Sequence, residues 1–103
     1  MEAWLGLGSN LQHPVAQLRW ALKRLSETKG ITVKKVSSFY CTPPWVDEEQ
    51  DDFVNAVAQI ETDLEPVPLL QVLQSIEDVM GRERNDRRWG PRLIDIDLLL
   101  YGD

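Results

Sequence analysis

The chain has 103 residues, a length that favours one domain with one modest hydrophobic core over two domains that would each be too small. Its hydrophobic fraction of 43% and charged fraction of 27% are ordinary for a globular protein, and no apolar run approaches the ~20 residues of a membrane-spanning helix. The formal net charge of −6 argues against nonspecific nucleic-acid binding, which requires an extended basic surface.

Two further features bear on where the protein works. The first ten residues lack the basic segment and apolar stretch of a secretion signal, so we expect a cytoplasmic protein. Cys41 is the single cysteine, which excludes an intramolecular disulfide and any cysteine-rich metal site. We interpret Cys41 as a small buried hydrophobe.

The first predicted elements are a strand and a helix. Residues 3–7 are apolar and run into GLGSN at 6–10, which predicts a tight turn. This cluster also resembles a phosphate-cradling turn, but it lacks the complete glycine pattern and the lysine ending. His13 is expected at the start of the helix, with Pro14 in its first turn and Gly30 near its end. The apolar stripe expected to face the core comprises Val15, Leu18, Leu22 and Leu25.

A second strand is predicted over residues 31–41. In a regular strand Ile31 and Val33 would point to one face and Val36 to the other. We therefore expect a bulge near Lys34 and Lys35. Prolines at positions 43 and 44 then hold an extended, stiff backbone. Five acidic side chains within residues 47–52 predict a solvated loop rather than a metal site.

A third strand is predicted over residues 53–61. Alternation gives it one apolar face and one mixed face, and Phe53 and Asn55 are neighbours on the mixed face. An aromatic ring beside an amide that both donates and accepts can bind a flat heterocycle. The same pair is also typical of an ordinary half-buried strand face.

A second helix is predicted from Pro66 to Met80, with Gly81 ending it. Its buried stripe is expected to comprise Leu69, Leu73, Ile76 and Met80. Gln71, Gln74 and Asp78 are expected to face outward, and Glu77 to lie at the edge of the stripe.

The segment from Arg82 to Asp97 concentrates more chemistry than any other. Its five arginines, at 82, 84, 87, 88 and 92, are planar donors suited to phosphate oxygens. Residues 93–100 alternate, which places Asp95 and Asp97 on one strand face and Ile94, Ile96, Leu98 and Leu100 on the other. Two carboxylates this close repel unless a cation lies beside them, and Mg²⁺ shared with substrate phosphates meets that need. The alternative is a solvated basic loop before an amphipathic edge strand.

The predicted elements follow the order strand, helix, strand, strand, helix, strand. This order predicts an α+β, ferredoxin-like βαββαβ fold for residues 1–103 as a single domain, with an antiparallel sheet and two helices on one face. The other face would then carry Phe53, Asn55, Asp95 and Asp97 together.

Four motifs carry a resemblance to a known family: LGSN at 7–10, SSFYCTPP at 37–44, DDFVNA at 51–56 and RRWGPRLIDIDLLLYG at 87–102. The last is highly specific. With these motifs, the chain resembles the 6-hydroxymethyl-7,8-dihydropterin pyrophosphokinase family of the folate pathway.

The resemblance implies transfer of pyrophosphate from ATP to the hydroxymethyl oxygen of a reduced pterin, with release of AMP. It implies that Asp95 and Asp97 hold two Mg²⁺ ions, and that Arg82 and Arg92 stabilise charge on the transferring group. The nucleotide-binding residues that it implies are Gln74, Glu77, Arg84, Arg88 and Trp89. The pterin-binding residues that it implies are Thr42, Pro43, Pro44, Phe53, Asn55 and Asp95.

Two departures from the family pattern affect these expectations. The loop after Pro44 reads WVDEEQDDF, where the family usually has Gly-Pro and a proline before the aromatic residue. Family members also continue well past the position of Asp103, so we expect a chain that lacks the family's C-terminal segment, with its fold retained and its activity reduced.

The alternative function is a catalytically silent ferredoxin-like module that binds a nucleotide or a partner protein. We expect a monomer or a dimer paired through an exposed strand edge, with neither a nucleic-acid nor a membrane partner.

Overall fold

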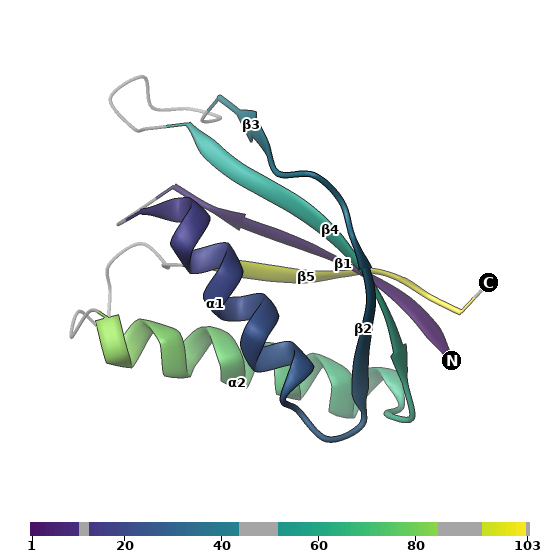
Figure 1. Cartoon of the computed structure of the whole chain (residues 1–103). Coiled ribbons are helices and arrows are strands. Elements are labelled where there is room, and N and C mark those ends of the chain that lie inside the picture. The colour runs from purple at the N-terminus through teal and green to yellow at the C-terminus, as the bar shows by residue number, and fades with distance from the viewer. Residues whose placement is uncertain (11–12, 44–51, 85–93, 103) are drawn as a thin grey trace.

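The computed structural model describes residues 1–10, 13–43, 52–84 and 94–102, and of residues 82–84 it describes only the helical backbone. The elements are β1 (Glu2–Ser9), α1 (Pro14–Ser26), β2 (Ile31–Val36), β3 (Tyr40–Thr42), β4 (Phe53–Thr62), α2 (Pro66–Arg84) and β5 (Asp95–Tyr101). Within these residues the strands form one antiparallel sheet in the order β2-β4-β1-β5, and β3 pairs with the N-terminal part of β4. Both helices cover the same face of the sheet (Figure 1). The predicted α+β, ferredoxin-like fold is confirmed.

The hydrophobic core lies between the sheet and the two helices. Successive side chains of a strand point to opposite faces, so every second residue of the central strands faces the helices. The buried strand residues include Ala3, Leu5 and Leu7 of β1 and Ala56, Ala58 and Ile60 of β4. The helices contribute Leu18, Ala21, Leu25, Leu69, Leu73, Ile76 and Met80. Among the described residues no helix covers the opposite face of the sheet, which we call the open face.

The first strand is longer than predicted. β1 continues to Ser9, so Gly6 and Gly8 lie inside the strand and not in a turn. Gly6 pairs with Val57 and Gly8 with Asn55. Neither glycine has a positive φ, so the backbone conformation does not require them. A glycine inside a strand often marks the close approach of another group.

The first helix begins where the sequence predicts. His13 takes the left-handed conformation with φ 63°, and Pro14 follows as the first helical residue. Val15, predicted to face the core, is 41% exposed. The helix turns by about 100° per residue, and Val15 lies roughly that far from the centre of the buried face. The buried residues of the helix are Gln17, Leu18, Ala21 and Leu25.

The strand predicted over residues 31–41 is interrupted. β2 ends at Val36, and β3 starts only at Tyr40. The pairing of β2 with β4 shifts register between Val33 and Lys35, which confirms the predicted bulge. Cys41, expected to be buried, is exposed, because the short strand β3 lies beside β4 at the border of the sheet.

The second helix confirms its predicted buried stripe but not its predicted end. α2 continues through Gly81 to Arg84. A β-carbon built at Gly81 would meet nothing within 4 Å, so packing does not require a glycine there. A glycine inside a helix is tolerated at a cost of about 1 kcal/mol relative to alanine. In the part of the chain that the structure describes, neither helix is long and apolar enough to cross a membrane.

The last strand follows the predicted alternation only as far as Leu98. Ile94 and Ile96 are buried, and Leu98 packs against the core. A register shift opposite Trp4 then pairs Leu100 with Trp4, and Leu100 is 59% exposed. The prediction that Leu100 shares the apolar face was therefore wrong, because a bulge adds one residue and reverses the alternation beyond it.

Candidate functional site

The two aspartates of β5 project from the open face. Ile96, between them, is buried and pairs with the buried Leu7, so its side chain points toward the helices. Asp95 and Asp97 therefore point the other way, as the alternation predicts. Asp97 is exposed and Asp95 is half-buried.

The amide of Asn55 lies on the same face and is held by strand β3. Its Nδ2 donates to Thr42 Oγ1 at 2.8 Å and more weakly to the carbonyl of Tyr40 at 3.4 Å. The carbonyl oxygen of Tyr40 can only accept a hydrogen bond, so the nitrogen of the Asn55 amide must face β3. The Oδ1 atom of Asn55 therefore points away from β3. Phe53, two residues before Asn55, is half-buried and pairs with Thr42.

The amide and the carboxylates meet at one end of the sheet. Gly8 pairs with Asn55 on one side and with Asp95 on the other, so these three residues form one row across β4, β1 and β5. Neighbouring strands lie about 4.8 Å apart, which puts the backbones of Asn55 and Asp95 roughly 10 Å from each other. Side chains from β4 and β5 can thus reach one small molecule seated over β1, the strand between them.

Glu77 supports this strand from the helix side. Its Oε2 accepts a hydrogen bond from the backbone N–H of Ile96 at 2.8 Å. Because β5 borders the sheet, that N–H has no neighbouring strand to pair with among the described residues, and the half-buried carboxylate takes that place. Glu77 therefore fixes the backbone between the two aspartates.

The remaining predicted site residues are only partly described. Gln74 is exposed on α2, and Pro43 is exposed directly after β3. Pro44, Arg88, Trp89 and Arg92 lie outside the described residues, as do the side chains of Arg82 and Arg84.

The carboxylate pair fits a hard cation that takes most of its ligands from elsewhere. Among the described residues no group of three or more histidine, cysteine, aspartate and glutamate side chains could hold a metal. Zinc sites usually need three or four such ligands, whereas Mg²⁺ is commonly bound by one or two carboxylates together with water and phosphate oxygens. The carboxylate oxygens of Asp95 and Asp97 are groups of this kind.

Sequence reasoning missed two contributors to this arrangement. It assigned Gly8 to a turn, and it gave no role to the backbone of Tyr40, whose carbonyl orients the Asn55 amide. Both contributions depend on which residues pair across neighbouring strands. The sequence predicts the strands more readily than this register.

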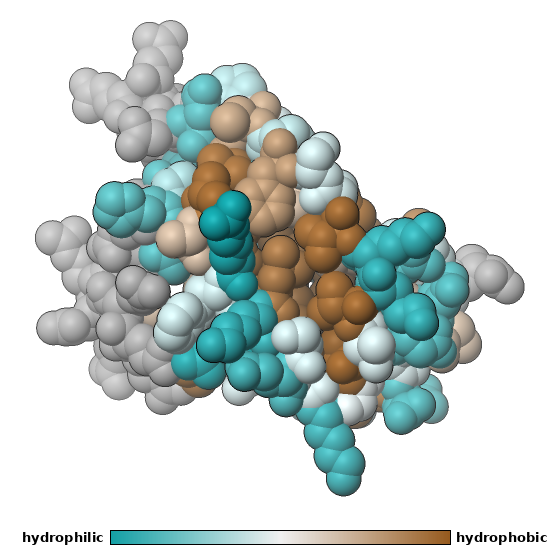
Figure 2. Space-filling view, viewed as in Figure 1, coloured by the Kyte–Doolittle hydropathy of each residue, from teal (hydrophilic) through white to brown (hydrophobic). Residues whose placement is uncertain are grey.

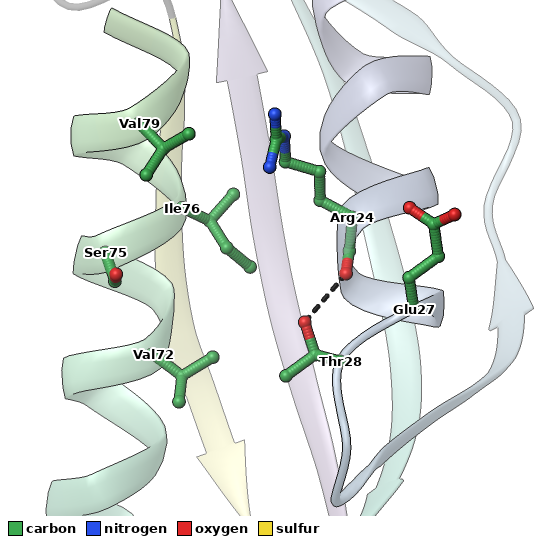
Figure 3. A pocket seen from close by; sticks show the side chains of 7 residues that line it. All are labelled: Arg24, Glu27, Thr28, Val72, Ser75, Ile76 and Val79. Atoms are coloured by element: carbon green, nitrogen blue, oxygen red, sulfur yellow. Dashed lines mark hydrogen bonds between the residues drawn. The ribbon is translucent and has the colours of Figure 1, made fainter. Parts of the chain in front are cut away.

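A separate hollow lies between the two helices, on the opposite side of the sheet from Asp97. It is lined by Val72, Ser75, Ile76 and Val79 of α2 and by Arg24, Glu27 and Thr28 at the end of α1 (Figure 3). Thr28 Oγ1 donates to the carbonyl of Arg24 at 2.7 Å. Figure 2 shows hydrophobic surface among hydrophilic side chains on this side of the molecule. None of the described residues that line this hollow is a predicted site residue.

The fold and this arrangement define a ferredoxin-like α+β protein with an amide and a carboxylate pair on its open sheet face. The model of the 7,8-dihydro-6-hydroxymethylpterin-pyrophosphokinase family matches residues 4–102, and the chain belongs to this family.

Curated relatives support the assignment. A 2-amino-4-hydroxy-6-hydroxymethyldihydropteridine pyrophosphokinase of Methylorubrum extorquens is 52% identical over 100 residues, which cover 97% of this chain and 63% of the relative. The protein of the same name from Haemophilus influenzae is 50% identical over 103 residues, which cover 100% of this chain and 64% of the relative. A third, from Pseudomonas aeruginosa, is 45% identical over 105 residues, an alignment that covers 99% of this chain and 62% of the relative. The chain thus spans somewhat less than two thirds of the length of these relatives.

Proposed function

We propose that this chain transfers pyrophosphate from ATP to the hydroxymethyl oxygen of 6-hydroxymethyl-7,8-dihydropterin, releasing AMP, in tetrahydrofolate biosynthesis. Its family membership and the printed names of its relatives support this reaction. The single observation that carries the proposal for this chain is the row formed by Asn55, Gly8 and Asp95, which gathers an amide and a carboxylate at one end of the open face. Because the reaction consumes ATP, we assign it to the cytoplasm.

The proposed pterin site comprises β3 and the start of β4. Phe53 would stack on the ring, and Asn55 would bond its edge. The hydrogen bond from Asn55 to Thr42 supports this assignment, because it holds the amide in one orientation before any ligand binds. Backbone groups near Pro43 and Pro44, together with Asp95, would complete the contacts to the pterin.

The proposed nucleotide site lies beside the carboxylates of β5. Asp95 and Asp97 would hold two Mg²⁺ ions, which supply charge neutralisation for the ATP phosphates. Arg82 and Arg92 would stabilise charge on the transferring group, and Gln74, Glu77, Arg84, Arg88 and Trp89 would contact the nucleotide. No general base is assigned, so positioning and electrostatics would carry most of the rate.

An assay of AMP release tests the proposal. The wild-type chain is incubated with ATP, Mg²⁺ and the reduced pterin, and AMP is measured with and without the pterin. Asp97→Asn should lower pterin-dependent AMP release by at least about 100-fold, because it removes one of two proposed metal carboxylates. Asp63→Asn, which changes an exposed carboxylate after the far end of β4, should leave the rate unchanged.

The possible outcomes separate the two functions. Pterin-dependent AMP release that disappears with Asp97→Asn supports the enzyme. A wild-type chain that releases no AMP in response to pterin at any Mg²⁺ concentration contradicts it and supports the catalytically silent module.

A further inference from the structure

We infer that Gly8 is a positioning residue for pterin recognition, because its missing side chain lets the Asn55 amide lie across strand β1. This inference rests on the proposed function for its ligand, and on the geometry of β1 and β4 for the position of the amide.

The first observation is that the backbone conformation at position 8 does not require a glycine. Gly8 lies inside β1, has no positive φ, and pairs with a residue on each side. Glycine in a strand interior is destabilising relative to alanine, because it loses more backbone freedom on folding. A residue that carries such a cost without a conformational benefit requires another explanation.

The second observation is the space above Gly8. An ideal β-carbon at this position would lie 3.0 Å from Asn55 Oδ1 and 4.0 Å from Asn55 Cγ. Attractive contacts of carbon begin near ~3.5 Å, so the amide would have to move by a few tenths of an ångström. Gly8 is buried, and the Asn55 amide lies over it.

The third observation is that the amide cannot move freely. Its Nδ2 donates to Thr42 Oγ1 at 2.8 Å, so displacement from Gly8 strains or breaks this bond. Thr42 and Gly8 therefore hold opposite sides of the amide group. With the nitrogen bonded toward β3, Oδ1 lies over β1 and can accept a hydrogen bond from an N–H on the edge of a ligand.

The neighbouring glycine provides a matched control. Gly6 lies on the same face of the same strand, and a β-carbon there would meet the terminal methyl groups of Leu99 at 3.4 Å. Leu99 is 51% exposed, so its side chain can yield. Gly6→Ala therefore makes the same chemical change on the same strand without touching Asn55.

Binding of the reduced pterin to wild type, Gly8→Ala and Gly6→Ala, measured by calorimetry in the presence of Mg²⁺ and a nonhydrolysable ATP analogue, tests the inference. Gly8→Ala should raise the Kd for the pterin by about tenfold, because recognition groups must be held within ~0.5 Å of their productive positions. The Kd for the ATP analogue should change less than about twofold. Gly6→Ala should leave both values within about twofold of wild type. Equal pterin affinity for Gly8→Ala and Gly6→Ala overturns the inference.

A double-mutant cycle separates positioning from general damage to the strand. If Gly8 acts through Asn55, then adding Gly8→Ala to Asn55→Ala should change the Kd by less than about twofold, since the displaced group is already gone. A full additional tenfold loss in the Asn55→Ala background overturns the inference.

The position of the amide is measured without ligand. The side-chain N–H₂ signals of Asn55 in ¹⁵N NMR spectra should shift in Gly8→Ala and stay in place in Gly6→Ala, and unmoved signals in Gly8→Ala overturn the inference. A wild-type chain that binds no reduced pterin refutes the proposed function, whereas normal pterin binding by Gly8→Ala refutes the inference about Gly8 alone.

Discussion

Replacing Glu77 with alanine removes the acceptor that holds the backbone between the two aspartates of β5. In the structure Glu77 Oε2 accepts from the Ile96 N–H at 2.8 Å, and Glu77 is half-buried. A hydrogen bond to a charged partner contributes about 1.5–3 kcal/mol when it is buried. Because water can replace part of a half-buried partner, we expect Glu77→Ala to lower the free energy of unfolding by about 1–2 kcal/mol.

The assay combines chemical denaturation with hydrogen exchange. A loss of 1.4 kcal/mol corresponds to a factor of about ten in an equilibrium constant, so the Ile96 amide should exchange roughly tenfold faster in Glu77→Ala. Glu77→Gln keeps an oxygen acceptor and should lose about half as much stability. Asp78→Ala is the matched control, because it removes the neighbouring carboxylate, which is exposed, from the same helix.

One result would refute this reasoning. If the Ile96 amide exchanges as slowly in Glu77→Ala as in Asp78→Ala, the carboxylate does not hold the edge of β5. A global loss of stability with unchanged relative protection of Ile96 would instead assign Glu77 a role in helix packing.

Two further predictions concern stability. Gly81→Ala should raise the free energy of unfolding by about 0.5–1 kcal/mol, because the position is helical and the added methyl group meets nothing within 4 Å; a lower denaturation midpoint would contradict this. Burial, and secondarily the charge of Glu65, raises the pKa of Tyr101, whose hydroxyl donates to the carbonyl of Leu64 at 2.6 Å. The folded state therefore keeps the phenol proton more firmly than the unfolded state, so stability that is present below pH ~10 should be lost as the pH rises through the raised pKa. Between pH 9 and 11 the melting temperature of the wild type should fall more steeply with pH than that of Tyr101→Phe. Parallel curves for the two proteins would contradict this role of Tyr101.

Much of the fold follows from periodicity in the sequence. The alternation of β4 and the stripe of α2 both predict their buried faces, because burial requires apolar residues at the period of the element. Val15 and Leu100 depart from the prediction for geometric reasons: one lies at the margin of a helix face, and the other follows a bulge that the residue pattern does not reveal.

The site is less predictable because it depends on pairing between strands. The sequence places Asp95 and Asp97 on one face, but only the register brings Asp95 and Asn55 to opposite sides of Gly8. Glycine is locally ambiguous, because a turn and a close packing contact both favour it. The interpretation of Gly8 as a turn residue failed for this reason.

Paramagnetic broadening by Mn²⁺ tests the central claim most directly, namely that the carboxylates of β5 bind a metal on the open face. Substoichiometric Mn²⁺ is added to the wild-type chain with a nonhydrolysable ATP analogue, and backbone amide signals are followed by NMR. We predict that signals of Gly8, Asp95 and Asp97 broaden first, that those of Thr28 and Thr62 near the far end of the sheet persist, and that Asp97→Asn abolishes the effect. Broadening that centres away from β5, or that is the same in Asp97→Asn, would contradict the claim.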